Sequence, residues 1–239
     1  MIKRDIIVMG ASAGGIEAYC EILRGLPADL AASVFIVQHL GSKSVLADVL
    51  GRCAALQLAT AADGEAVREG RAYVAPACQH MLLHGGKVRL SRAARENNQR
   101  PSVDALFRSA AKAYRSRVIA VVLTGMLNDG AAGACAVKEC GGLVIVQDPR
   151  TATHSSMPEN ALRAVQVDHC VPLAEIPALL VHLVRGGGGE PDLAGIAAPR
   201  TSRRAPIPTR SQLAALEAKS VRAPLAPRDP PRSALTTTN

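Results

Sequence analysis

Residues 5–24 read DIIVMGASAGGIEAYCEILR, and this stretch decides the predicted fold. The apolar run over residues 5–9 ends in a glycine-rich turn over residues 10–15, a pattern that is typical of a buried strand. After the turn, apolar residues recur at helical spacing and predict a helix over residues 16–24. A strand, a glycine turn and a helix in this order form the first half of a parallel β-α-β unit.

The same alternation of apolar runs and amphipathic segments continues to about Arg185. It predicts strands over residues 34–37, 118–123 and 143–146, and helices over residues 44–53, 130–140 and 173–184. Strands that alternate with helices imply parallel β-α-β units with right-handed crossovers. We therefore expect an α/β fold with a doubly wound, mostly parallel, Rossmann-like sheet.

The middle of the chain has a different pattern. Residues 72–75, together with residues 81–84 and 87–90 around Gly85-Gly86, resemble a hairpin. We therefore expect a small antiparallel hairpin insertion between two parallel halves.

Composition limits the classes of partner and compartment. Aromatic residues make up only 2% of the 239 residues, which argues against single-stranded nucleic acid as a partner, because such binding stacks bases on aromatic rings. The six cysteines form no C-x-x-C pair, which is typical of a reducing compartment. No run of ~20 apolar residues predicts a membrane insertion, and no secretory signal is present. We expect a cytoplasmic protein without nucleic-acid or membrane partners.

The chain divides into two regions of different composition. Four consecutive glycines begin at Gly186, and the 54 residues from there to the end hold eight of the 15 prolines. They also carry eight Lys or Arg against four acids, which is half of the net charge of +8. We expect a folded domain over residues 1–185 and a disordered tail over residues 186–239. The tail is either solvated or a tether for an acidic partner surface.

The turn GASAGG at residues 10–15 has two functional interpretations. Dinucleotide binding fits poorly, because G-x-G-x-x-G needs glycine at position 12, which is serine. A nucleophile elbow fits better, because Gly10-x-Ser12-x-Gly14 matches G-x-S-x-G between a strand and a helix. The alternative is that Ser12 only caps the helix that follows.

A serine nucleophile needs a base and an acid, and the ends of two other predicted strands supply them. His39 follows the strand over residues 34–37, and Asp129 follows the strand over residues 118–123. In a parallel sheet these positions share the edge where ligands bind. His154 is the alternative base and Asn128 the alternative acid, while Asp129 is also a natural cap for the next helix.

Metal ligands are not indicated elsewhere. His80 and His84 are four residues apart, but they fall in the predicted hairpin and have no third ligand nearby. We expect no metal site and no cofactor.

Six separated motifs, in order, resemble the catalytic domain of the CheB-type chemotaxis methylesterases. The resemblance covers about residues 5–184 and rests on GASAGG (10–15), VQHL (37–40), DGEAVREGRAYVAP (63–76), RPSVDALF (100–107), LTGMLNDGAAG (123–133) and MPENA (157–161). It implies hydrolysis of glutamate methyl esters on chemoreceptors, deamidation of receptor glutamines, and a serine catalytic triad.

The resemblance assigns that triad to Ser12, His39 and Asp129. It places Met126 at the rim of the site and Arg100 in a segment that borders the cleft. Backbone N–H groups near Ala13 and Gly14, or at Met126, are the candidate donors to the oxyanion.

Two positions depart from the family pattern: residue 127 is Leu where the family usually has Gly, and residue 13 is Ala where many members have Thr. The family's N-terminal receiver domain has no counterpart in this sequence.

The expected partner is the cytoplasmic domain of a methylated chemoreceptor. A separate regulatory partner would replace the receiver domain, or the site would be constitutively accessible. Leu127 and the missing receiver also motivate an alternative function, a non-catalytic module of the same fold that binds the receptor.

Overall fold

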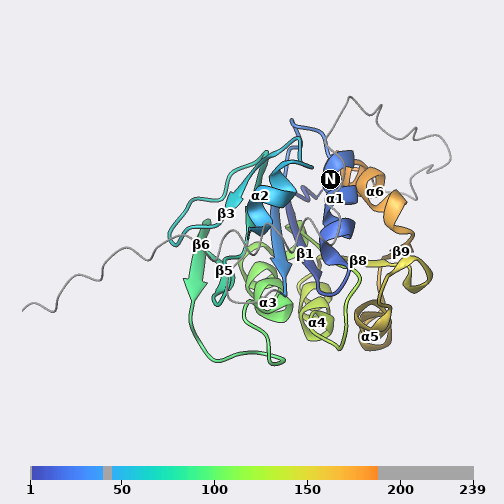
Figure 1. The fold of residues 1–239 in the computed structure, drawn as a ribbon. Coiled ribbons are helices and arrows are strands. Elements are labelled where there is room, and N and C mark those ends of the chain that lie inside the picture. Colours follow the sequence, from blue (N-terminus) through green and yellow to red (C-terminus); the bar gives the residue numbers. More distant parts are fainter. Residues whose placement is uncertain (1, 40–44, 188–239) are drawn as a thin grey trace, which may run out of the picture.

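The computed structural model describes residues 2–39 and 45–187 (Figure 1). Seven strands of this part form a parallel sheet in the order β3-β4-β2-β1-β7-β8-β9, and a separate antiparallel pair joins β5 to β6. The bounds of the strands are β1 Ile6–Ala11, β2 Ser33–Gln38, β3 Gln57–Thr60, β4 Arg71–Val74, β5 His80–His84, β6 Lys87–Ser91, β7 Val118–Val122, β8 Leu143–Gln147 and β9 His169–Val171. The predicted α/β class, the doubly wound sheet and the antiparallel insertion are confirmed.

The chain enters the sheet at its centre. From β1 it builds outward through β2 to β3 and β4, and it then crosses back to place β7 on the other side of β1. Such a reversal of strand order opens a crevice at the carboxyl ends of the two central strands. The carboxyl ends of β1, β2 and β7 therefore converge on one edge of the sheet.

Helices cover both faces of the sheet (Figure 1). Alternate side chains of β1 point to opposite faces, so Ile7 and Met9 join one buried cluster while Ile6 and Val8 join the other. The first cluster packs under α1, α2 and α6, and the second packs under α3, α4 and α5. The bounds of the helices are α1 Gly15–Gly25, α2 Leu46–Gly51, α3 Val103–Tyr114, α4 Ala131–Glu139, α5 Ser156–Ala164 and α6 Ile176–Val184.

Gly10 in β1 sets how closely α3 approaches the sheet. A Cβ atom at Gly10 would lie 2.2 Å from Cγ1 of Val103, the first residue of α3. Only a glycine accommodates this contact without a shift. The N-terminus of α3 is thereby brought to the edge of the sheet where β1 ends.

The prediction for residues 72–75 was wrong in its pairing. This segment belongs to β4, which runs parallel to β2 and β3 within the main sheet, and only β5 and β6 pair as the hairpin. The physical reason is burial: Ala72, Tyr73 and Val74 are all buried, as expected for a strand covered on both faces.

Among the strands and α-helices of the described residues, four were not predicted: β3, β9, α3 and α5. No residue of β3 or β9 is fully buried, so neither edge strand has the long apolar run that identifies a central strand. The predicted helix over residues 173–184 begins as a 3-10 turn, Leu173–Glu175, before α6. The predicted tail lies outside the described residues, apart from Gly186 and Gly187.

Candidate active site

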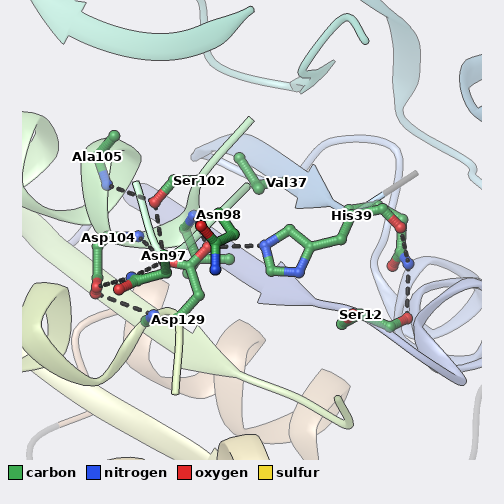
Figure 2. A network of polar contacts seen from close by, with 12 residues as sticks. Ser12, Val37, His39, Asn97, Asn98, Ser102, Asp104, Ala105 and Asp129 are labelled. Carbon is green, nitrogen blue, oxygen red and sulfur yellow. Dashed lines mark hydrogen bonds and ion pairs between the residues drawn. The ribbon is translucent and has the colours of Figure 1, made fainter. Parts of the chain in front are cut away.

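The carboxyl ends of three neighbouring strands bring the predicted triad together. Ser12 directly follows β1, His39 directly follows β2, and Asp129 lies in the loop between β7 and α4. Figure 2 shows the His39 ring lying between Asp129 and Ser12. The three groups therefore meet at the reversal of strand order, where an open α/β sheet binds its ligands.

The turn around Ser12 is fixed by hydrogen bonds on both sides. The Ser12 N–H donates to the carbonyl of Thr124 at 3.0 Å, and the Ser12 carbonyl accepts from the Gly15 N–H at 3.0 Å. Nε2 of Gln38, at the end of β2, also donates to that carbonyl at 2.6 Å. The backbone of Ser12 is thus held by its own turn and by both neighbouring strands.

Glycine is required at two places around this turn. Gly14 has φ +79°, a left-handed conformation that favours glycine, and its Cβ would lie 2.8 Å from Cβ of Thr153. A Cβ at Gly125 would lie 2.9 Å from Cβ of Ser12 and 2.1 Å from Sδ of Met157. Gly125 therefore leaves the room that the Ser12 side chain occupies.

His39 and Asp129 form the central hydrogen-bonded pair of the site. Nε2 of His39 lies 2.7 Å from Oδ2 of Asp129, and the two side chains are 8% and 2% exposed. Because the carboxylate can only accept, the ring hydrogen at this contact is on Nε2, and Nδ1 is the nitrogen left to act as a base. Within the described residues, the Ser12 hydroxyl has no hydrogen bond to this ring.

The N-terminus of α3 surrounds the carboxylate of Asp129. Oδ2 accepts from the backbone N–H of Val103 at 2.8 Å, and Oδ1 accepts from the N–H of Asp104 at 3.0 Å and from Oγ of Ser102 at 2.8 Å. Burial alone would raise the pKa of Asp129. The hydrogen bonds from His39 and from these N–H groups outweigh burial and hold the pKa at about 2.

Asp129 does not cap α4, which was the structural alternative for this residue. The N-cap of α4 is Gly130, which has no side chain to accept a hydrogen bond. Asp104 of α3 accepts instead from the N–H groups of Gly130 at 3.0 Å and Gly133 at 2.6 Å. Burial, together with the charge of Asp129, raises the pKa of Asp104.

Backbone N–H groups near Ser12 are available to a ligand. Among the described residues, the N–H groups of Ala13, Gly14 and Met126 donate to no acceptor, whereas those of Gly15 and Gly125 are used within the fold. The residue after a serine nucleophile commonly supplies an oxyanion donor, which is Ala13 here. The arrangement can therefore bind a developing negative charge beside Ser12.

The rim of the site contains two exposed apolar side chains, Met126 at 57% and Leu127 at 61%. Leu127 has φ +68°, a left-handed conformation in which a non-glycine residue is strained. Its carbonyl accepts from Nδ2 of Asn160 at 2.8 Å and from Oγ of Ser156 at 3.3 Å, and both donors lie on α5. Glycine would adopt this conformation without strain.

Arg100 was predicted to border the cleft, but its guanidinium is used within its own loop. Nη1 of Arg100 donates to the carbonyls of Arg92 and Ala93, at 2.8 Å each. The alternative base, His154, contributes its backbone: its N–H donates to Oγ1 of Thr124 at 2.9 Å and its carbonyl accepts from the Gly125 N–H at 3.0 Å. Its ring has no acid partner within the described part of the chain.

Residues 2–39 and 45–187 contain no group of three His, Cys, Asp or Glu side chains arranged to hold a metal ion. In the same ranges no helix is long and apolar enough to cross a membrane.

Comparison with known proteins adds to this geometry. Residues 7–180 match the family model described as CheB methylesterase. The chain belongs to the CheB methylesterase family. The predicted family and the expected enzyme class are confirmed.

Relatives and a solved structure agree with this membership. A Leptospira interrogans relative is 39% identical over 182 residues, which are 75% of this chain and 94% of the relative. The protein-glutamate methylesterase/protein-glutamine glutaminase of Moorella thermoacetica is 42% identical over 191 residues, which are 77% of this chain and 45% of that protein. The crystal structure of the Thermotoga maritima CheB methylesterase catalytic domain matches with a TM-score of 0.72 and 37% identity, covering 77% of this chain and all of that domain.

Sequence reasoning missed several residues that hold the CheB site together. Ser102 donates to Asp129, and Asn97 donates from Nδ2 to Oδ2 of Asp104 at 2.7 Å and to Oδ1 of Asp129 at 3.0 Å. The sequence could have indicated Ser102, because serine just before a helix is a common N-cap. For Asn97 the sequence offers only a pair of asparagines, which indicates a turn but not a contact with the site.

Proposed function

We propose that this chain is a serine hydrolase that demethylates glutamate methyl esters, and deamidates glutamines, on chemoreceptors. The observation that carries the proposal is the His39–Asp129 pair beside Ser12, at a 2.7 Å contact, in a chain of the CheB methylesterase family. The name of the Moorella thermoacetica relative states both activities, methylesterase and glutaminase.

The first half of the proposed reaction is acyl transfer to Ser12. Nδ1 of His39 takes the hydroxyl proton as Oγ of Ser12 attacks the ester carbonyl carbon, and the carbonyl π electrons move onto oxygen. The Ser12 hydroxyl must first come within hydrogen-bond reach of Nδ1. In unliganded enzymes such contacts are often long and shorten when substrate binds. The N–H groups of Ala13 and Met126, which donate to no acceptor among the described residues, would donate to the oxyanion.

Collapse of the tetrahedral intermediate completes this half. The C–O bond to the methoxy group breaks, the proton on Nδ1 of His39 goes to the leaving oxygen, and methanol departs. Water, activated by the same nitrogen, then hydrolyses the glutamyl ester of Ser12 to glutamate. With a glutamine substrate ammonia leaves in the first step, and the second step is unchanged.

Asp129 supports both proton transfers. Its carboxylate, ionised at neutral pH because its pKa is about 2, keeps the ring hydrogen on Nε2 and stabilises the imidazolium that forms during attack. The same contact holds the plane of the ring, so that Nδ1 remains directed away from Asp129.

The proposed setting follows from the substrate. The glutamate esters would lie on the cytoplasmic domain of a methylated chemoreceptor, so the chain would act in the cytoplasm. We propose residues 1–185 as the catalytic domain, with the triad at Ser12, His39 and Asp129.

Methanol release tests the proposal. The full chain is incubated with a receptor cytoplasmic fragment whose glutamates carry labelled methyl groups, and volatile label is counted. We expect release by the wild-type chain and none by Ser12→Ala, with both proteins folded by circular dichroism. Release by Ser12→Ala at the wild-type rate would overturn the assignment of the nucleophile. Receptor binding without release by the wild type would favour the non-catalytic module.

A further inference from the structure

The side-chain amide of Asn97 bridges two buried carboxylates at the edge of the site. One nitrogen, Nδ2, lies 2.7 Å from Oδ2 of Asp104 and 3.0 Å from Oδ1 of Asp129 (Figure 2). Both acids are almost fully buried, at 4% and 2% exposure. A neutral group with two N–H bonds satisfies two like charges at once, which a single hydroxyl cannot do.

Asn97 differs from the other donors to Asp129 in its origin. Among the described residues, those donors are His39 and groups at the N-terminus of α3, namely Ser102, Val103 and Asp104. Asn97 alone comes from the exposed loop between β6 and α3. It therefore adds a donor to the Asp129 carboxylate from an element other than α3 and His39.

The loop is shaped to present this amide. Glu96 and Gln99 exchange backbone hydrogen bonds at 3.1 and 2.8 Å, and the two residues between them, Asn97 and Asn98, have φ +48° and +59°. Positive φ at both central residues is the mark of a type I′ turn, which favours asparagine. An ion pair between Glu96 and Arg108 ties the same turn to α3.

Asp104 links Asn97 to the backbone around Asp129. While Oδ2 of Asp104 accepts from Asn97, its Oδ1 accepts from the N–H of Gly130, the residue that directly follows Asp129. Asn97 thus contacts Asp129 directly at its carboxylate and indirectly at its backbone.

We infer that Asn97 is a positioning residue for the proposed ester hydrolysis, which fixes the Asp129 carboxylate and through it the orientation of the His39 ring. The expected change in rate rests on the proposed function, whereas the expected change in the His39–Asp129 pair rests on the bridging contacts. Without the amide, Asp129 loses a charge-assisted hydrogen bond, and its carboxylate faces that of Asp104 with no donor between them. Asn97 contacts no reacting atom, so its loss should lower kcat and leave KM unchanged.

The adjacent Asn98 provides a matched control. It has the same side chain and a similar left-handed φ, but within the described residues its amide makes no hydrogen bond. Glycine is favoured at both positions, so Asn97→Gly and Asn98→Gly each remove one amide without backbone strain. For Asn97→Gly we expect kcat for methanol release to fall by roughly 10- to 100-fold, the effect of one hydrogen bond to a charged group. Asn98→Gly should stay within about twofold of the wild type.

A spectroscopic measurement separates positioning from a general effect on the fold. The proton shared by Nε2 of His39 and Asp129 should give a far-downfield proton resonance in the nuclear magnetic resonance spectrum of the full chain. We expect it to shift or broaden in Asn97→Gly and to remain unchanged in Asn98→Gly, with both variants fully folded at the temperature of the measurement. Failure of the wild type to release methanol would overturn the proposed function, while the resonance would still decide the link from Asn97 to His39. An unchanged resonance together with wild-type kcat in Asn97→Gly, or equal losses in both variants, would overturn the inference.

Discussion

Asp104 belongs to α3 and Asp129 lies just before α4, and each accepts hydrogen bonds from the start of the other's helix. Asp129, which lies just before α4, receives the N–H groups of the first turn of α3, whereas Asp104 of α3 receives those of Gly130 and Gly133 at the start of α4. A helix N-terminus stabilises a negative charge. The exchange holds the acid of the proposed triad between two helices that also pack against each other.

The two acids should have opposite effects on stability as the pH falls. The pKa of Asp129 is lowered from 3.8 to about 2, so its charge stabilises the fold by about 2 kcal/mol above about pH 4, and this is lost as the pH falls toward 2. The pKa of Asp104 is raised, so its contribution is present at low pH and declines as the pH rises through the folded-state value.

Urea unfolding of Asp129→Asn and Asp104→Asn, in steps from about pH 7 to about pH 3, measures this contrast. The stability advantage of the wild type over Asp129→Asn should shrink with falling pH, and its advantage over Asp104→Asn should grow. Parallel pH curves for the two variants would contradict the opposite shifts.

Leu127 should be a position where glycine is tolerated or stabilising. A φ of +68° destabilises the fold by about 1–2 kcal/mol when the residue is not glycine. Glycine avoids this strain, but its greater loss of conformational entropy on folding lowers stability by roughly 0.5–1 kcal/mol. We expect Leu127→Gly to raise the free energy of unfolding by up to about 1 kcal/mol. Leu127→Ala retains the strained backbone and removes only an exposed side chain, so it should change stability little. A loss of more than about 1 kcal/mol in Leu127→Gly would show that the backbone is not strained there.

Gly125 should not accept even alanine. The added Cβ would meet Sδ of Met157 at 2.1 Å and Cβ of Ser12 at 2.9 Å, so either the core or the nucleophile must shift. We expect Gly125→Ala to lower the free energy of unfolding by about 1–3 kcal/mol and kcat by at least roughly tenfold.

Gly51→Ala is the control for this change, because nothing lies within 4 Å of a Cβ at that position in α2. It should leave the rate of methanol release unchanged. Wild-type kcat in Gly125→Ala would mean that the packing beside Ser12 does not limit where the nucleophile lies.

Much of the fold could be predicted because the central strands are buried on both faces. β1, β2 and β7 are entirely buried and are correspondingly apolar in sequence. Ser12, His39 and Asp129 could be selected together for a related reason, since polar residues just past such strands fall on one edge of a parallel sheet. That they lie on the same edge of the sheet follows from the strand order.

What the sequence could not supply are contacts that cross between helices and loops. Asp129 before α4 has the pattern of a cap for α4, and only the packing of α3 against α4 shows that it serves α3 instead. Asn97 is an exposed polar residue in a loop, and no periodicity predicts that its amide faces two buried acids. Strand β4 paired differently from expectation because a short buried run does not reveal its neighbours.

Covalent labelling of Ser12 tests the central claim most directly. The full chain is treated with a fluorophosphonate, which reacts with activated serines, and the adduct is located by peptide mass spectrometry in the wild type and in His39→Ala. The account predicts one adduct, on Ser12, and labelling slower by at least roughly 100-fold in His39→Ala, because the base that activates the hydroxyl is gone. No adduct, an adduct on another residue, or labelling of His39→Ala at the wild-type rate would contradict it.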